Sequence, residues 1–227
     1  MENKPIRKKY PEKIKPIADT ISIKEVYDKG NELKNPEYKC LYYILYLTGA
    51  RVGEIIDYLR VRDIDYKTLT ETDDNDNTII RSVAVFDVVT EKRKDRPKRK
   101  LPVMYKDTRV ADAYYYENLM IEYIKAFNNS KMVEEKVFRV KRTSATNYYK
   151  RHIQFPIGAV YKGKRIDVNY RMHPHYLRHC RITHMREMYG FDILDLKQFA
   201  GWTSTKMTDT YLHAGWRNLI GKMINNG

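Results

Sequence analysis

The chain has 227 residues, of which 42% are hydrophobic, so it can bury one good core, or one full domain with a small appendage. Lysine and arginine total 43 against 29 aspartates and glutamates, and the net charge of +14 favours a polyanionic partner, nucleic acid first. An acidic membrane surface is the rival, but no run approaches the ~18 apolar residues of a spanning helix, and no stretch combines a strongly basic face with an apolar one. We therefore expect a nucleic-acid partner and no membrane association.

The N-terminal segment and the cysteines indicate the compartment. The sequence MENKPIRKKYPEKIKPI has no apolar segment and is not a secretory signal. Residues 1–20 are expected to form a basic arm or linker, and residues 21–227 a single domain. Cys40 and Cys180 lie in helix-like runs without C-x-x-C or Cys/His metal spacing. A reduced, cytoplasmic protein without a structural zinc is the expectation.

Helix signals dominate the first third of the domain. Ser22 followed by Glu25 is a capping box that predicts a short helix. Asn35 as N-cap and Pro36 at the first helical position predict a core helix over PEYKCLYYILYLT, which Gly49 ends. A further helix is predicted directly after it, over ARVGEIIDYL.

The middle of the chain changes to strand signals. The runs IIRSVAVFDVV and KRKLPV predict antiparallel strands joined by the basic turn TEKRKDRP, with the acidic loop ETDDNDN before them. Asp107 is expected to cap a helix over about 107–127, and Thr143 one over about 144–154. From Pro174 onward the pattern is helical. Helices around one small antiparallel sheet make the expected fold class α+β.

Three separated stretches carry residues suited to chemistry on a phosphate. In TGARVGEI, Arg51 stands at a sharp helix-to-helix turn, where it either projects into a cleft or forms a surface pair with Glu54. In HPHYLRH, Pro174 places His175 and Arg178 in the first turn of a helix, on one face and near free backbone N–H groups that suit a phosphate. Ordinary basic surface is the alternative interpretation.

The flanking histidines, His173 and His179, are expected to cap the helix or to pack against it, because they do not share the face of His175 and Arg178. The third stretch, FAGWTSTKMTDTYLH, places Trp202 and Tyr211 nine positions apart across a glycine-containing turn. Taken alone, this third signal is weak.

Together the three stretches resemble, in order and spacing, the tyrosine recombinase (phage integrase) family. The family carries T-G-x-R-x-x-E, then H-x-L-R-H, then a glycine followed by His or Trp, and a tyrosine nine positions later; this chain has TGARVGE, HYLRH, Gly201-Trp202 and Tyr211. The strand pair between the first two stretches also resembles the family's hairpin. The resemblance covers about residues 20–227 and corresponds to the family's catalytic domain, without the core-binding domain that normally precedes it. The chain is expected to be either a catalytic fragment or a minimal protein.

The resemblance implies transesterification on double-stranded DNA through a 3′-phosphotyrosyl intermediate, with no cofactor and no metal. Tyr211 would be the nucleophile. Arg51 and Arg178 would bind the non-bridging phosphate oxygens, and Trp202 would donate one more hydrogen bond. His175 would accept or orient the tyrosine proton.

The general acid and the assembly element are also implied by the resemblance. The family's catalytic lysine lies in the hairpin turn, where Lys92 is the first candidate and Lys94 the second. The C-terminal segment 215–227 has one apolar stripe, which would dock on a neighbouring protomer of a DNA-bound homo-oligomer, a tetramer, or else on its own domain. The stripe consists of Trp216, Leu219, Ile220 and Met223.

Two other functions share some of these features. A type IB topoisomerase or telomere resolvase would use a similar set of residues, although H-x-L-R-H favours a recombinase. A non-catalytic basic DNA-binding protein would need neither Tyr211 nor a covalent step.

Overall fold

The structure is a computed structural model, and it describes residues 15–16, 20–91, 95, 97–110, 112, 114–161 and 164–202. Its helices are α1 (Ile23–Asn31), α2 (Pro36–Thr48), α3 (Val52–Tyr58), the short 3₁₀ helix η1 (Val61–Asp63), α4 (Tyr115–Asn128), α5 (Arg142–His152), α6 (Pro174–Glu187) and α7 (Ile193–Ala200). Its strands are β1 (Lys15–Pro16), β2 (Ile64–Thr72), β3 (Thr78–Val89), β4 (Lys98–Asp107), β5 (Gln154–Tyr161) and β6 (Lys164–Arg171). The fold class is α+β, as expected.

The predicted starts of the first two helices are confirmed. The Ser22 hydroxyl accepts a hydrogen bond from the Glu25 amide at 3.2 Å, and the Glu25 carboxylate accepts one from the Ser22 amide at 2.8 Å, which is the reciprocal capping box. At α2 the Asn35 side chain caps the helix, Pro36 occupies the first turn, and Gly49 ends the helix with φ +56°. A positive φ is available to glycine at little cost, so the stop signal acts through backbone conformation.

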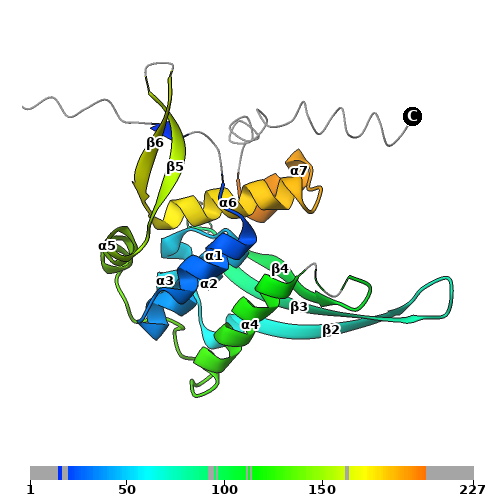
Figure 1. Cartoon of the computed structure of the whole chain (residues 1–227). Helices are drawn as coiled ribbons and strands as arrows, with labels where there is room; N and C mark the ends of the chain where they lie inside the picture. The colour runs from blue at the N-terminus through cyan, green and yellow to red at the C-terminus, as the bar shows by residue number, and fades with distance from the viewer. Residues whose placement is uncertain are drawn as a thin grey trace, which may run out of the picture.

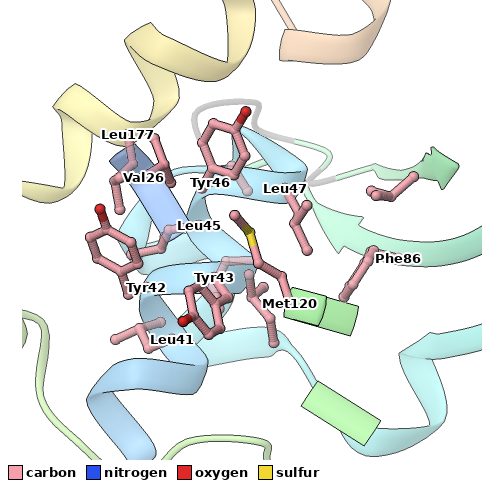
Figure 2. Packing of buried hydrophobic residues seen from close by; sticks show 14 of the residues in the cluster. Val26, Leu41, Tyr42, Tyr43, Leu45, Tyr46, Leu47, Phe86, Met120 and Leu177 are labelled. Carbon is pink, nitrogen blue, oxygen red and sulfur yellow. The ribbon is translucent and has the colours of Figure 1, made fainter. Parts of the chain in front are cut away.

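Helix α2 is the centre of the core. Every residue from Cys40 to Thr48 is buried, which is why this helix reads as apolar all round. Figure 2 shows its side chains pointing toward Val26 of α1, Leu177 of α6 and Phe86 of β3. Figure 1 shows α4 beside α2, and α6 crossing above α1 and α2. The buried helix α2 thus holds together α1, which precedes it, and α4 and α6, which come later in the chain.

The predicted hairpin is the middle and edge of a three-stranded antiparallel sheet in the order β2-β3-β4. Its register pairs Phe86 with Leu101 and Val89 with Lys98, so the turn between β3 and β4 begins where these strands separate. Strand β2 pairs with β3 as far as Thr72 and Thr78. This end of the β2–β3 pair extends past β4 (Figure 1). The acidic loop therefore lies at the tip of the β2–β3 pair, although its first residues, Glu71 and Thr72, belong to β2.

The expectation of a single sheet is wrong. A second antiparallel sheet has the order β1-β5-β6, and its β5–β6 hairpin projects from the body of the molecule near the start of α6 (Figure 1). Within the predicted basic arm, Lys15 and Pro16 pair with Val160 and Ala159 of β5. The rest of the arm prediction lies outside the described residues, except for residue 20.

Two helix starts also differ from expectation. Strand β4 runs as far as Asp107, and α4 begins only at Tyr115. The Asp107 carboxylate does not cap this helix; it accepts hydrogen bonds from Arg81 at 2.9 Å and from the Arg109 amide at 2.9 Å. Helix α5 begins at Arg142 rather than after Thr143, and its N-cap residue, Lys141, makes no side-chain cap. Over the described part of the chain, no helix has the length and apolarity needed to span a bilayer.

Candidate active site

The turn between α2 and α3 positions Arg51. Thr48 is buried, donates to the Ile44 carbonyl at 2.6 Å and accepts from the Ala50 amide at 3.2 Å. A Cβ on Gly49 would lie 3.2 Å from Cε1 of Phe199 in α7, so the turn both needs a positive φ and lies close to another helix. Arg51 follows as the N-cap residue of α3.

Glu54 is a fully buried carboxylate that holds Arg51 in place. Its oxygens accept hydrogen bonds from the Arg51 amide and from Arg51 Nη1, each at 2.9 Å, and from Arg99 Nη2 at 2.8 Å. Burial by itself raises the pKa of Glu54, but the bonds and charges of Arg99 and then Arg51 outweigh it, so the pKa lies below the ordinary carboxyl value. The expected Arg51–Glu54 pair therefore exists, but it is an anchored pair with a third partner and not a loose surface contact.

Arg178 joins the first and third predicted stretches to α6. It is 2% exposed; its Nη1 donates to the Gly49 carbonyl at 2.5 Å and its Nη2 to the Ala200 carbonyl at 2.7 Å. Its Cζ lies 5.8 Å from the ring centroid of Trp202. These contacts fix the guanidinium plane between the end of α2 and the end of α7. Arg181, one turn further along, is equally buried, so this part of α6 is not an ordinary solvated basic surface.

His175 lies at the exposed edge of this cluster, in the first turn of α6. Partial desolvation, then the charges of Arg178, His173 and Arg51, lower its pKa to about 4. The imidazole is therefore neutral at pH 7 and can accept a proton. His173 is the N-cap residue, but its side chain makes no cap hydrogen bond; its Nε2 pairs with the Tyr170 hydroxyl at 2.7 Å.

Trp202 closes the other side of the cluster. It is buried, and its amide donates to the Lys197 carbonyl at 3.0 Å after Gly201 has turned the chain with φ +65°. A groove of about 290 Å³ separates Trp202 and α7 from the base of the β3–β4 turn. The residues that the structure brings together are thus Arg51, His175, Arg178 and Trp202.

Three further predicted site residues, Lys92, Lys94 and Tyr211, lie outside the described residues. For the two lysines, the structure does describe the residues at the base of the β3–β4 turn. There the Thr90 amide donates to the Pro97 carbonyl at 2.9 Å, and the Glu91 amide donates to Glu54 Oε1 at 3.4 Å. The apolar stripe of segment 215–227 is also outside the described part. Within the part of the chain that the structure describes, no group of three or more His, Cys, Asp or Glu side chains is arranged to hold a metal ion.

Most of the sequence matches one known protein family. The profile described as "Phage integrase family" matches residues 19–216. The chain belongs to the phage integrase family. No curated protein matches the sequence significantly.

Solved structures of recombinases share the fold of this family member. A XerH site-specific recombinase bound to palindromic difH substrate is similar with a TM-score of 0.54 and 15% identity, over 91% of this chain and 52% of that one. The XerA recombinase is similar with a TM-score of 0.53 and 18% identity, over 97% of this chain and 66% of that one. The chain thus spans between half and two thirds of the length of these recombinases.

Sequence reasoning missed two parts of this arrangement. The sequence indicates Glu54 only as a possible partner of Arg51, and Arg99 only as part of the strand run KRKLPV. The hydrogen bond between Arg99 and Glu54 joins residues 45 positions apart, and no local sequence pattern predicts it. A carboxylate inside an otherwise apolar helical run, as in RVGEII, was the available signal, because a buried charge needs a partner.

Proposed function

We propose that this chain carries the catalytic domain of a site-specific DNA recombinase that cleaves and rejoins duplex DNA through a covalent tyrosine intermediate. The observation that carries the proposal is the meeting of Arg51, His175, Arg178 and Trp202, which come from three separate stretches. The XerH structures were solved with DNA substrate bound, and the net charge of +14 suits the same kind of partner.

In the proposed reaction the Tyr211 oxygen attacks the scissile phosphorus, and the bond from phosphorus to the 5′-oxygen breaks. The products are a 3′-phosphotyrosyl link and a free 5′-hydroxyl, and the reverse attack by a 5′-hydroxyl rejoins the strand. Arg51 and Arg178 stabilise the charge that grows on the non-bridging oxygens, with the Trp202 indole N–H as a further donor. Neutral His175 accepts or orients the tyrosine proton, and Lys92, or else Lys94, protonates the departing oxygen.

Fixed guanidinium groups make a metal unnecessary for this charge stabilisation, and no cofactor is required. We infer that the chain acts as a homo-oligomer on DNA, a tetramer, held together through segment 215–227. A topoisomerase-like nicking and closing activity is less favoured, because the H-x-L-R-H stretch is typical of recombinases.

The nucleophile is tested by covalent capture. The protein is mixed, in excess EDTA, with a library of nicked duplexes that have a randomised central segment, and the adducts that survive denaturant are isolated and sequenced. We expect the wild type and Tyr115→Phe, which changes an exposed tyrosine, to form adducts. Tyr211→Phe should bind the recovered DNA and form none.

Three results would contradict parts of this proposal. An adduct from Tyr211→Phe would show that another residue is the nucleophile. Cleavage that stops in EDTA and returns with Mg²⁺ would refute the metal-free mechanism. DNA binding by the wild type without any adduct would favour the non-catalytic DNA-binding protein.

A further inference from the structure

The Arg99 side chain makes three hydrogen bonds to three different parts of the chain. Its Nη2 donates to Glu54 Oε2 at 2.8 Å, its Nη1 to Thr90 Oγ1 at 2.8 Å, and its Nε to the Phe199 carbonyl at 3.2 Å. The guanidinium is largely buried, with its side chain 11% exposed. Arg99 thus connects β4 with α3, with the end of β3 and with α7.

Each of these acceptors is linked, directly or through a neighbouring residue, to a residue of the proposed reaction. Glu54 also binds Arg51, at 2.9 Å. Thr90 closes the base of the turn that contains Lys92 in sequence, because its backbone N–H donates a hydrogen bond to the Pro97 carbonyl. Phe199 precedes Ala200, whose carbonyl accepts from Arg178. A shift of this one guanidinium would therefore be transmitted to the positions of both arginines and of the turn.

The surroundings are specific for a guanidinium. A Cβ on Gly201 would lie 3.0 Å from Arg99 Nη1, so the glycine leaves the space that the planar group occupies. Glu54 is ionised, and its second partner, Arg51, is part of the proposed site. Arg99 neutralises the charge of Glu54, which would otherwise compete with the phosphate for Arg51. A lysine could reach one acceptor but has no fixed fork for three.

We propose that Arg99 is a positioning residue of the cleavage reaction, which acts through Glu54 on Arg51 and through Thr90 on the base of the lysine turn. The inference rests on the proposed recombinase activity, because the residues that it positions are those of that reaction.

The experiment compares single-turnover cleavage, at saturating concentrations of the captured DNA, with DNA affinity and melting temperature. The test variants are Arg99→Met, Arg99→Lys, Glu54→Gln and Thr90→Val. The matched control is Arg81→Met, because Arg81 is also a largely buried arginine of the same sheet that pairs with a buried carboxylate, Asp107, but lies away from the site.

We expect Arg99→Met to slow cleavage about 10²-fold, since small displacements of catalytic groups cost about this much. DNA affinity should change less than about threefold, because Arg99 is not a surface cation. Arg99→Lys should recover part of the rate. In a Glu54→Gln background, Arg99→Met should cost less than about tenfold, because the connection to Arg51 is already lost. In a Thr90→Val background, Arg99→Met should likewise cost less than it does in the wild type, and Thr90→Val alone should slow cleavage less than Glu54→Gln.

The inference is wrong if Arg99→Met cleaves as fast as Arg81→Met, or if the losses of Arg99→Met and Glu54→Gln simply multiply in the double variant. If Arg99→Met does not fold, the same double-variant comparisons are made with Arg99→Lys and decide the question. Failure of the recombinase proposal is a separate result, because the wild type would then form no adduct with any of the DNA.

Discussion

The buried His184 links the structure of the protein to its stability at low pH. Its side chain is buried in α6, and its Nδ1 lies 2.8 Å from the Tyr46 hydroxyl. Desolvation, and then the charge of Arg181, lower the pKa of His184 to about 4. The native protein therefore holds this imidazole neutral under conditions in which an unfolded chain would protonate it.

This difference predicts a loss of stability in mild acid. An unfolded histidine has a pKa of about 6.5. Between that value and about 4 the unfolded state binds one more proton than the native state, so the free energy of unfolding falls as the pH falls through this window. We expect His184 to account for about 3 kcal/mol of this loss by pH 4.

Urea unfolding of the wild type and His184→Gln at pH 7 and pH 4.5 measures the effect. The variant should start less stable and lose less on acidification. An equal loss in both proteins would mean that His184 does not carry the pH dependence.

The helices and strands that could be predicted from the sequence are those specified by residues close together in the chain. The cap of α1, the cap and stop of α2, and the pairing of β3 with β4 each depend on residues close together in the chain. The start of α4 does not: Asp107 has the chemistry of a cap, but Arg81, 26 positions earlier, binds it across the sheet. Strand β5 was not predicted because Pro156 and Gly158 interrupt the strand pattern. It pairs with β6 on one side and, on the other, with β1 from near the N-terminal end of the chain.

The same distinction applies to the candidate site. Arg51, His175, Arg178 and Trp202 could be identified because motif spacing names them one stretch at a time. Their support by Arg99 could not, because it depends on how β4 meets α3 and α7. Sequence motifs identify groups that act on a substrate better than groups that hold those residues in place.

The β3–β4 turn offers a test of which lysine is the general acid. A 5′-bridging phosphorothiolate has a leaving group that needs no protonation, so it should restore cleavage to a variant that lacks the acid. We expect Lys92→Ala to be slow on normal DNA and close to the wild type on the phosphorothiolate. Lys94→Ala should differ little from the wild type on either substrate, and the opposite pattern would move the role to Lys94.

For the whole molecule, the proposed homo-oligomer on DNA predicts a role for the C-terminal segment. Removal of residues 215–227 separates the two possible docking sites of the apolar stripe. If the segment docks on a neighbour, the truncated protein should keep its melting temperature and bind DNA as a monomer, but lose higher-order complexes and strand exchange. If it packs on its own domain, the melting temperature should fall sharply.

Point substitutions make the same test without truncation. Leu219→Ser with Ile220→Ser should reproduce the loss of higher-order complexes, while Lys222→Ser, outside the stripe, should not. Gel-shift stoichiometry and melting curves provide the readouts. A truncated protein that melts early and still assembles on DNA would contradict docking on a neighbouring protomer.

The span of the contacts around Arg178 and Arg99 has a consequence for biosynthesis. Arg178 binds a carbonyl 129 positions earlier, and Arg99 binds one 100 positions later. Such long loops close late, because their entropy must be paid before the contacts form. A nascent or partly folded chain would therefore already carry its positive charge while the residues of the proposed site are still apart. Under the proposed function, such a chain could bind DNA before it could cleave a strand.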